Sequence, residues 1–488
     1  MRKIIMILIF CFLIINISAQ EYKTYHENGQ LYVVGKIENG KLVGEWKNYH
    51  ENGQLEFIGK YEKGFKVGEW KLYFKNGKIK SIGKYSNEKG IKDGEWKFYF
   101  DNGKILSIGK YENGKKDGEW KLYHENGQLF TIENFKNEEQ VGVWKKFYTN
   151  GQLFAIEKYE RGIQVGEWKE YHVNGKLKYI GKYENGKEIG EWKNYYTNGQ
   201  LEKIGRYSKG YKIGEWRYYS VNGKLKHIGK YERGIQVGEW KYYYENGQLE
   251  SVGKMEKGNY ESIDFGPGYK IGEWKYYYKN GQLKRVGKQS RGIGVGEWKN
   301  YYENGQLKNI GKYERGKQDG DWKYYNENGK LFQIVQFKKG KQDGNWKYFH
   351  ENGQLKSVGE VENGKQDGEW KYYYKNGQLW KFGKLSRGLG FGEWKQYFEN
   401  GRLSSIGQFK NGKKVGEWKF YHKNGKLENI GKYERGKMVG EWKVYHKNEQ
   451  LWKIGQFKNG LQDGDWKYYD ENGKFVNTLT YINGKVQE

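Results

Sequence analysis

A motif of twenty-four residues recurs along almost the whole chain and limits the folds that the chain can adopt. Residues Gly44–Val67 read GEWKNYHENGQLEFIGKYEKGFKV, and Gly68 begins the next copy. A repeat of this length is too small to bury its own apolar side chains, so neighbouring copies must pack against one another. We therefore expect one continuous repeat domain at residues 20–488.

One tryptophan marks each repeat and serves as position 0 in the numbering used below. Successive tryptophans keep the spacing of Trp46 and Trp70, except that the interval from Trp70 to Trp96 is two residues longer and that from Trp240 to Trp274 is ten residues longer. Tyr22 holds position 0 in an opening repeat, so that nineteen repeats fill residues 21–488. The repeat tryptophans are Trp46, Trp70, Trp96, Trp120, Trp144, Trp168, Trp192, Trp216, Trp240, Trp274, Trp298, Trp322, Trp346, Trp370, Trp394, Trp418, Trp442 and Trp466.

Two glycine positions predict two chain reversals in each repeat. An Asn-Gly pair stands at positions +6 and +7, as in Asn52-Gly53, in every repeat except the one with Asn448-Glu449. A second glycine recurs at position +18, as in Gly64. Asn-Gly between aromatic and β-branched residues is a strong hairpin signal, and no segment shows helical spacing. We predict an all-β fold, an elongated single-layer antiparallel β-meander of about nineteen 24-residue β-hairpin repeats. The tight turns disfavour a parallel β-solenoid.

The type of the Asn-Gly turn sets the register of each hairpin. A two-residue type I′ loop places Trp46 opposite Gly59, where the ring covers a position without a side chain. A three-residue loop with a bulged glycine moves the register by one residue and places Trp46 opposite Ile58. We favour the two-residue loop, and the sequence leaves both registers open.

The favoured register assigns the side chains to an aromatic face and a charged face. Tyr61 lies opposite Gly44 and covers it, and Glu45 lies opposite Lys60 as a cross-strand ion pair. The aromatic face carries Trp46, His50, Leu55 and Tyr61, and the charged face carries Glu45, Lys47, Tyr49, Ile58 and Lys60. The residues expected to stabilise the fold of each repeat are, in the repeat that begins at Gly44, Gly44, Trp46, Tyr49, Asn52, Gly53, Leu55, Ile58, Gly59, Tyr61 and Gly64. Function is therefore expected at positions that vary between copies, namely +2, +4, +10 and +11.

The first residues of the chain are typical of a secretory signal peptide. Arg2 and Lys3 precede an apolar run at residues 4–15, which is too short to span a bilayer. A cut between Ala19 and Gln20 follows a small residue, so we predict a signal peptide at residues 1–19; the alternative is an uncleaved N-terminal anchor. The protein is then exported to a periplasm, the cell surface or the medium.

Composition and hydropathy add four constraints. Cys11 is the one cysteine and lies in the predicted signal peptide, so the mature chain has no disulfide to stabilise it. A mean hydropathy of −1.09 is typical of disorder, but an aromatic content of 18% argues for a folded chain. Loss of Arg2 and Lys3 lowers the net charge from +28 to +26, which favours acidic partners. No later segment is apolar enough for a transmembrane span in the mature chain.

The motif Gly-Glu-Trp-Lys-x-Tyr-x-x-Asn-Gly-Gln/Lys-Leu-x-x-Ile-Gly-Lys-Tyr-x-x-Gly resembles the bacterial variant of the MORN repeat. The resemblance covers residues 21–488 and implies β-hairpins laid side by side. It also implies a link to membrane lipids and scaffolding, as in eukaryotic relatives, or an antitoxin of the YwqK type, a label that many bacterial members carry. This chain differs from compact antitoxins in its predicted signal peptide and its length.

The sequence offers no constellation for catalysis, a cofactor or a metal. It lacks a nucleophile elbow, a phosphate-binding loop and, after cleavage, a thiol. Seven of its eight histidines share position +4, where adjacent copies lie two strands apart, too far for one zinc ion. These histidines are His26, His50, His124, His172, His350, His422 and His446. We expect no enzyme activity, no cofactor and no metal site.

Three features remain as candidate contacts. Lysines at positions +1 and +14, such as Lys47 and Lys60, form either a basic track for anionic polymers or headgroups, or a solvated face that pairs with glutamates. The insertion at residues 259–268 interrupts the repeat and is a candidate contact loop or a tolerated surface insertion; it contains Tyr260, Ile263, Asp264, Phe265 and Pro267. Trp380 and Trp452, at position +10, are expected on the charged face.

The sequence thus predicts an exported, non-enzymatic repeat scaffold. Its repeated aromatic and basic faces would bind proteins or an anionic envelope or membrane surface through many weak contacts. Peripheral membrane contact fits this prediction, whereas single-stranded nucleic acid does not suit an exported protein. The alternative is an antitoxin-like or immunity-like protein that neutralises one toxin partner.

Overall fold

Every regular element that the structure describes is a β-strand. The computed structural model describes residues 19–86, 88–258 and 268–487. The chain divides into an N-terminal unit, residues 1–234, and a C-terminal unit, residues 235–488. The predicted all-β fold is confirmed.

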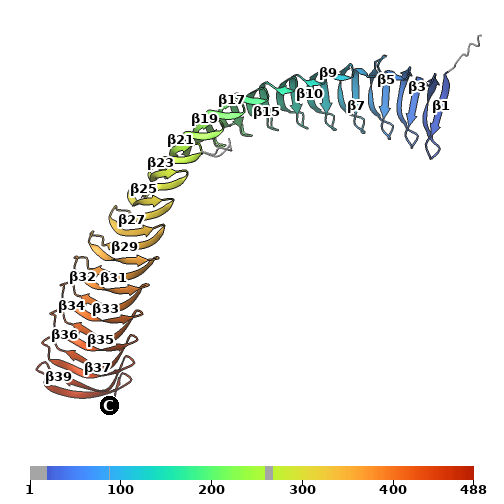
Figure 1. Ribbon diagram of the computed structural model, residues 1–488. Coiled ribbons are helices and arrows are strands. Elements are labelled where there is room, and N and C mark those ends of the chain that lie inside the picture. The colour runs from blue at the N-terminus through green and yellow to red at the C-terminus, as the bar shows by residue number, and fades with distance from the viewer. Residues whose placement is uncertain (1–18, 87, 259–267, 488) are drawn as a thin grey trace, which may run out of the picture. The chain divides into compact units, whose positions relative to one another are not determined.

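The N-terminal unit contains twenty strands (Figure 1). They are β1 (Gln20–Tyr25), β2 (Leu31–Glu38), β3 (Lys41–Tyr49), β4 (Leu55–Glu62), β5 (Phe65–Tyr73), β6 (Ile79–Tyr85), β7 (Lys92–Tyr99), β8 (Ile105–Glu112), β9 (Lys115–Tyr123), β10 (Leu129–Lys136), β11 (Glu139–Gln140), β12 (Gly142–Phe147), β13 (Leu153–Glu160), β14 (Ile163–Gln164), β15 (Gly166–Tyr171), β16 (Leu177–Glu184), β17 (Lys187–Tyr195), β18 (Leu201–Ser208), β19 (Tyr211–Tyr219) and β20 (Leu225–Glu232).

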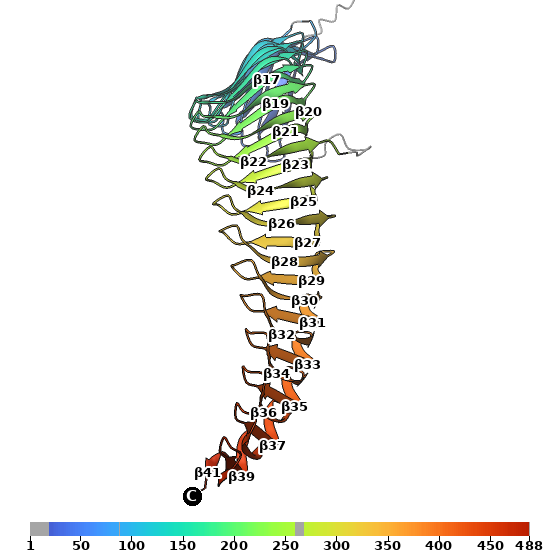
Figure 2. The same ribbon diagram turned by 90° about the vertical axis from the view of Figure 1, so that its left-hand side faces the viewer.

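The C-terminal unit holds the remaining strands, which Figure 2 shows next to one another in chain order. They are β21 (Ile235–Tyr243), β22 (Leu249–Glu256), β23 (Tyr269–Tyr277), β24 (Leu283–Ser290), β25 (Ile293–Tyr301), β26 (Leu307–Glu314), β27 (Lys317–Tyr325), β28 (Leu331–Lys338), β29 (Lys341–Phe349), β30 (Leu355–Glu362), β31 (Lys365–Tyr373), β32 (Leu379–Ser386), β33 (Leu389–Tyr397), β34 (Leu403–Lys410), β35 (Lys413–Tyr421), β36 (Leu427–Glu434), β37 (Lys437–Tyr445), β38 (Leu451–Lys458), β39 (Leu461–Tyr469), β40 (Phe475–Ile482) and β41 (Lys485–Val486).

Within each unit, strands that follow one another in the chain pair antiparallel, as β3 with β4 and β4 with β5. This pairing is a meander and agrees with the prediction. The Asn-Gly turn, however, differs from the predicted type I′ turn. The N–H of Gly53 donates to the carbonyl of His50 at 2.8 Å, the N–H of His50 donates to the carbonyl of Gln54 at 2.8 Å, and Gly53 has φ = 79°. This is a three-residue loop with a bulged glycine.

The type I′ turn lies instead at the other end of the hairpin. Lys63 and Gly64 both have positive φ, at 51° and 87°, and Glu62 pairs with Phe65 across them. Two adjacent residues with positive φ define a type I′ turn. The second glycine of the repeat is therefore the one that supplies the two-residue loop.

A β-bulge next to the Asn-Gly turn restores the predicted strand register, although that register had been derived from a two-residue turn that is not present there. Tyr49 pairs with Leu55, but Asn48 pairs with Phe57, so Glu56 bulges out of the ladder. The bulge offsets the three-residue loop by one position. Trp46 consequently pairs with Gly59, as predicted, rather than with Ile58.

The same bulge corrects the predicted assignment of Leu55. Residues paired across an antiparallel ladder point to the same side of the sheet. Leu55 therefore lies on the charged face with its partner Tyr49, and not on the aromatic face.

Where the preceding repeat has glycine at position +13, the tryptophan ring covers that glycine and not the glycine of its own hairpin. A Cβ atom added to Gly59 would lie 2.2 Å from the ring of Trp70, and one added to Gly35 would lie 2.1 Å from the ring of Trp46. Seventeen of the eighteen repeat tryptophans are at most 6% exposed. The indole rows therefore form the apolar core of each unit, and they pack one repeat onto the next.

The predicted cover of Gly44 by Tyr61 is wrong, although the two residues are ladder partners. A Cβ atom on Gly44 would meet no atom within 4 Å, and the glycine is required by its φ of 70°. The ring of Tyr61 packs edge-on between Trp46 and Trp70, with centroids 5.9 and 5.0 Å away. Tyrosine thus joins the indoles of successive repeats.

Asparagine side chains at the Asn-Gly turns add a second connection between repeats. Asn52 Nδ2 donates to the carbonyl of Lys75 in the next turn at 2.7 Å, and Asn52 Oδ1 accepts from the N–H of Gln54 at 3.1 Å. The same pair of bonds joins Asn28 to Glu51 and Gln30. This dual role explains why asparagine recurs at a turn position that does not need positive φ.

Candidate functional site

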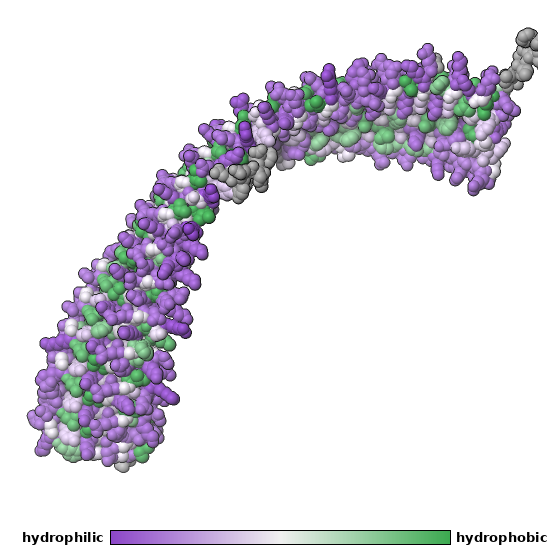
Figure 3. All heavy atoms as spheres, in the orientation of Figure 1, coloured by the Kyte–Doolittle hydropathy of each residue, from purple (hydrophilic) through white to green (hydrophobic). Residues whose placement is uncertain are grey.

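The repeats present two different surfaces, which we name by the residues that they carry. The tryptophan face carries positions −4, 0, +2, +11 and +15, and the charged face carries positions −1, +1, +3, +12 and +14. Figure 3 shows hydrophilic residues over most of the visible surface. Positions −4, +2 and +11, which vary most between copies, all point to the tryptophan face.

Ion pairs on the charged face run along a strand and not across the sheet. Lys47 Nζ lies 2.9 Å from Glu45, two residues away in β3, and Lys60 Nζ lies 2.6 Å from Glu62 in β4. The predicted pair between Glu45 and Lys60 is therefore wrong, although the two are ladder neighbours. The hydrogen bond to Glu45, followed by its charge, raises the pKa of Lys47.

Position +14 supplies a row of basic residues that the −1 glutamates do not neutralise. Most +1 lysines pair with the −1 glutamate of their own strand, as Lys47 does. Three +14 cations pair with the glutamate two residues further on, namely Lys60, Lys110 and Lys432, and the other +14 cations make no ion pair among the described residues. We call these residues the lysine row, and all of them are exposed. The row is dense in the N-terminal unit, with Lys36, Lys60, Lys84, Lys110, Lys158, Lys182, Arg206 and Lys230, and sparser in the C-terminal unit, with Lys254, Lys288, Lys312, Lys384 and Lys432.

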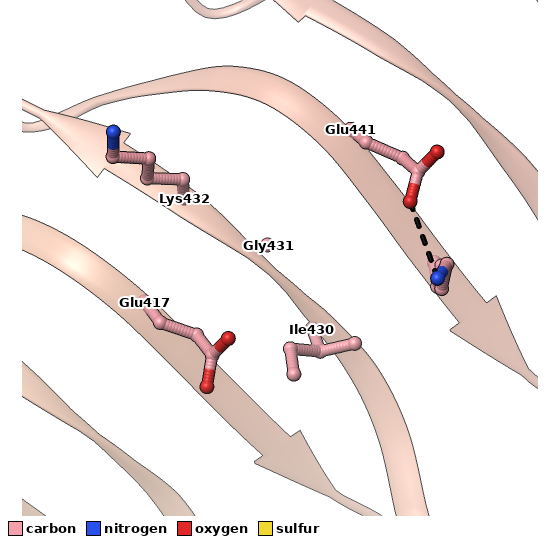
Figure 4. Close-up of a pocket in the computed structure, with 6 residues that line it drawn as sticks. Glu417, Ile430, Gly431, Lys432 and Glu441 are labelled. Atoms are coloured by element: carbon pink, nitrogen blue, oxygen red, sulfur yellow. Dashed lines mark ion pairs between the residues drawn. The ribbon is translucent and has the colours of Figure 1, made fainter.

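Shallow hollows lie beside the lysine row. One, of about 290 Å³, is lined by Glu417, Ile430, Gly431, Lys432, Glu441 and Lys443 (Figure 4). An equivalent hollow of about 330 Å³ lies at Lys110. The carboxylate of Glu441 is paired with Lys443 at 3.2 Å, while the Lys432 side chain points away from both glutamates in Figure 4. Lys432 instead lies 3.6 Å from Glu434, two residues further along the same strand, so its charge is directed away from the hollow.

The tryptophan face is largely closed by its own side chains. Lys66 Nζ lies 4.4 Å from the centroid of the Trp70 ring and 5.3 Å from that of Tyr85, and burial lowers the pKa of Lys66. Lysines at position −4 of other repeats take the same place, including Lys92, Lys116 and Lys212. The repeated aromatic surface that we expected to bind partners is thus mainly core.

Position +13 shows what happens where glycine is replaced. Val335 stands there before Trp346, which is the one repeat tryptophan that is partly exposed, and the Nε1 atom of Trp346 has no partner among the described residues. Glu157 stands there before Trp168. It is 6% exposed, pairs with Lys146 at 2.8 Å and accepts from the Tyr159 hydroxyl at 2.9 Å.

The histidines at position +4 connect successive repeats. His50 Nε2 lies 3.2 Å from the carbonyl of Tyr73, and His26 Nε2 lies 2.8 Å from the carbonyl of Tyr49. Where tyrosine holds the position, its hydroxyl makes the same bond, as from Tyr148 to the Tyr171 carbonyl at 2.7 Å. Within the described ranges, no three His, Cys, Asp or Glu residues are grouped to hold a metal.

The remaining predicted residues stand as follows. Gln20 begins β1, and the predicted cleavage after Ala19 stays a prediction. The contact-loop residues Tyr260, Ile263, Asp264, Phe265 and Pro267 lie outside the described residues. No helix that could cross a membrane occurs among the residues described.

The extra tryptophans occupy the bulge position +10. Trp380 is 41% exposed and Trp452 is 42% exposed. The ring of Trp380 contacts Tyr372, on the tryptophan face, with centroids 6.4 Å apart. The expected place on the charged face is therefore wrong for Trp380.

Comparisons with known proteins give a family but no close relative. No curated protein matches the chain. The solved structure of TcdB2-TccC3-Cdc42 is 11% identical, with a TM-score of 0.14 over 95% of this chain and 30% of that chain. A mutant Photorhabdus luminescens Tc holotoxin pore is 12% identical, with a TM-score of 0.15 over 94% and 25%. This chain spans less than a third of those chains, and such scores do not show a shared fold.

The family match covers most of the chain. The sequence pattern described as MORN repeat variant matches residues 21–39, 42–63, 66–87, 92–113, 116–137, 140–161, 164–185, 188–209, 236–257, 270–287, 295–315, 318–339, 342–363, 366–381, 392–411, 414–435, 438–459 and 462–483. These eighteen segments follow the hairpins described above. The chain belongs to the family of MORN repeat variant proteins.

Proposed function

We propose that the protein is an exported, non-enzymatic repeat scaffold that lies with its charged face on an anionic surface, such as a membrane with acidic headgroups. The lysine row carries this proposal. It places an exposed cation at position +14 of most repeats in the N-terminal unit, while the neighbouring +1 lysines are paired with glutamates.

The spacing of the row suits many weak contacts. Equivalent residues of adjacent repeats lie two strands apart, which is about 10 Å. A lysine near an anionic membrane contributes about 1 kcal/mol, so one repeat binds negligibly and several repeats together bind measurably. The proposal uses the charged face because the tryptophan rings are buried.

Sedimentation with vesicles of phosphatidylcholine and phosphatidylglycerol tests the proposal. We expect binding to fall steeply between about 50 and 200 mM salt, because exposed charges are screened over about 10 Å at 0.1 M. The row variant replaces four exposed lysines by glutamine, each without an ion pair among the described residues: Lys36, Lys84, Lys182 and Lys230. The matched control replaces four exposed turn or edge lysines and loses the same charge: Lys75, Lys115, Lys187 and Lys209.

The row variant should lose most binding, and the control variant should lose much less. Equal losses would show that net charge, and not the row, controls binding. A single stoichiometric complex with a protein, insensitive to salt, would instead favour the antitoxin-like alternative. Deletion of residues 259–268 should leave vesicle binding unchanged; a loss would assign binding to the predicted contact loop.

A further inference from the structure

Two notches open on the tryptophan face of the C-terminal unit. They lie in the Trp298 and Trp394 repeats, whose position −4 is glycine, Gly294 and Gly390 respectively; no other repeat has glycine there. The Gly294 notch has a volume of about 210 Å³ and the Gly390 notch about 230 Å³. Each is large enough for one ring of a ligand and smaller than the roughly 300–1,000 Å³ of a drug-sized site.

Glycine opens the notch because position −4 normally covers the indole. Where lysine holds this position, its Nζ atom lies 4.1 Å (Lys270) to 4.6 Å (Lys212) from the indole centroid. The ladder partner at position +15 also changes. Gln289 faces Gly294 and Leu385 faces Gly390, where most repeats carry tyrosine or phenylalanine. Both side chains that close an ordinary repeat are therefore replaced.

A cation stands on the wall of each notch. In the Gly294 notch, Arg285 is the ladder partner of Tyr276 on one side and of Asn300 on the other. Its guanidinium lies 4.4 Å from the ring centroid of Tyr276 and 4.9 Å from that of Trp298. The stacking holds the guanidinium on the wall of the cavity.

The Gly390 notch repeats this arrangement four repeats further along the chain. Lys381 pairs with Tyr372 and with Gln396, and its Nζ atom lies 4.7 Å from the ring of Tyr372 and 5.8 Å from that of Trp394. Both notches therefore combine an indole, an amide at +2 and, from the preceding repeat, a cation at +11. The coincidence of glycine, cation and amide at the same two places indicates a built site and not a packing gap.

The Gly294 notch also contains a buried polar atom without a partner. Gln289 is 8% exposed, and its Nε2 atom donates to the Tyr276 hydroxyl at 2.8 Å. Its Oε1 atom has no hydrogen-bond partner among the described residues. Leaving a buried acceptor unpaired is costly, so a ligand that donates a hydrogen bond here would gain affinity. Reversing the amide would leave its nitrogen, a donor, as the unpaired atom, and a ligand hydroxyl would then accept instead of donate.

We propose that the two notches bind the sugar rings of an acidic saccharide. The carboxylate of the sugar would pair with Arg285 or Lys381, a charge-assisted contact. The C–H face of the ring would lie against the partly exposed ring of Tyr313 in one notch and of Phe409 in the other, beside the buried indoles of Trp298 and Trp394. A ring hydroxyl would form a hydrogen bond with the free amide atom of Gln289 in the Gly294 notch. The site lies on the face opposite to the lysine row and does not depend on the function proposed above.

The spacing of the notches predicts the stoichiometry. Eight strand spacings separate equivalent residues, which is about 38 Å along the sheet. A trisaccharide is too short to reach both notches, so the full-length protein should bind two molecules. The Gly294 notch should bind more tightly, because Leu385 offers no hydrogen bond in the place of Gln289.

Titration calorimetry of the full-length protein with trigalacturonate tests the proposal, with maltotriose as the neutral comparison and triglutamate as the acidic peptide comparison. We expect two trigalacturonate sites and at least tenfold weaker binding of both comparisons. The variant Gly294→Gln with Gly390→Gln should weaken trigalacturonate binding at least tenfold. Glutamine is compatible with the fold, because Gln318, Gln342 and Gln366 hold position −4 elsewhere.

Two further variants make the outcome unambiguous. The double variant Arg285→Gln with Lys381→Gln leaves the notches open and should also weaken trigalacturonate binding at least tenfold. The control double variant, Lys384→Gln with Lys432→Gln, lies on the charged face and should leave trigalacturonate binding unchanged. The proposal fails if trigalacturonate does not bind, if the notch variants bind it normally, or if either comparison ligand binds equally well. Vesicle sedimentation of the same variants separates this failure from that of the lysine row.

Discussion

Replacing Gly59 by alanine should displace a buried indole from its position in the core of the N-terminal unit. The new Cβ atom would lie 2.2 Å from the ring of Trp70, whereas ordinary contacts begin at 3.4 Å, so the ring must move by more than one ångström. Trp70 is fully buried, with the rings of Tyr61 and Tyr85 5.0 and 5.8 Å away and Lys66 above it. None of these neighbouring side chains can move far enough to make room for the Trp70 ring without losing its own contacts.

Overpacking of this kind costs about 1–3 kcal/mol, and loss of a buried tryptophan from its site costs about 3–5 kcal/mol. We therefore expect Gly59→Ala to lower the free energy of unfolding of the N-terminal unit by about 2–4 kcal/mol. Urea unfolding followed by circular dichroism measures the change, and a red shift of tryptophan emission reports the displaced ring. Trp346, behind Val335, is partly exposed, whereas Trp144 and Trp168 stay buried behind Glu133 and Glu157, so the displaced ring can move either outward or within the core.

The reverse substitution is the control. Val335→Gly should let Trp346 bury its ring, shift emission to the blue and leave the stability of the C-terminal unit unchanged or higher. The reasoning is refuted if Gly59→Ala changes the unfolding free energy by less than about 0.5 kcal/mol, the range of ordinary surface substitutions, and leaves emission unchanged.

Three further predictions follow from single contacts. Asn52→Ala should cost about 1–2 kcal/mol in urea unfolding because it removes two hydrogen bonds, and Asn52→Asp, which keeps the acceptor, should cost less. Burial lowers the pKa of His227 to about 4, so the unfolded chain binds more protons between pH 6.5 and 4; stability should fall as the pH falls across this window, and His227→Gln should flatten the slope. Lys146→Met should cost about 3–5 kcal/mol because it leaves the carboxylate of Glu157 buried and unpaired, and adding Glu157→Gly should recover most of the loss.

Much of the fold could be predicted because every repeat carries the same turn and strand signals. The glycine spacing indicated two reversals and an antiparallel meander, and the pairing of Trp46 with Gly59 was correct. The turn behind that pairing was not. The bulge at Glu56 offsets the longer loop. A glutamate at position +10 does not predict a bulge, because the backbone there is determined by both neighbouring strands.

The direction in which the rings lean was also beyond the sequence. Trp46 has a glycine across each of its two ladders, Gly35 before it and Gly59 after it, and either could have been covered. The structure shows that Gly35 is covered, and this choice makes every repeat depend on the one before it. Similarly, the sequence showed Asn52 at a turn but could not show that its amide reaches Lys75 in the next turn, since that contact depends on the stacking distance.

The candidate sites differ in how far the sequence could find them. The lysine row required only the alternation of side chains along a strand, so the basic track was foreseen. The notches required the knowledge that positions −4, +2 and +11 meet on one face, which follows from the bulge and not from the spacing alone. Gly294 was visible as a departure from the repeat, but its meaning depended on Arg285 and Asn300, which are nine residues before and six residues after it.

A strict repeat makes its exceptions informative, because each position has many copies that define its ordinary role. Val335 and Gly294 are opposite exceptions on the same face: the first adds a side chain beside an indole that is partly exposed, and the second removes the side chain that covers an indole and leaves a cavity. An exception that only damages packing should stand alone, as the exposed Trp346 does. The glycines at position −4 instead recur with a cation and an amide at fixed offsets, and that second occurrence is difficult to explain by loss of packing, because three positions would have had to change together twice.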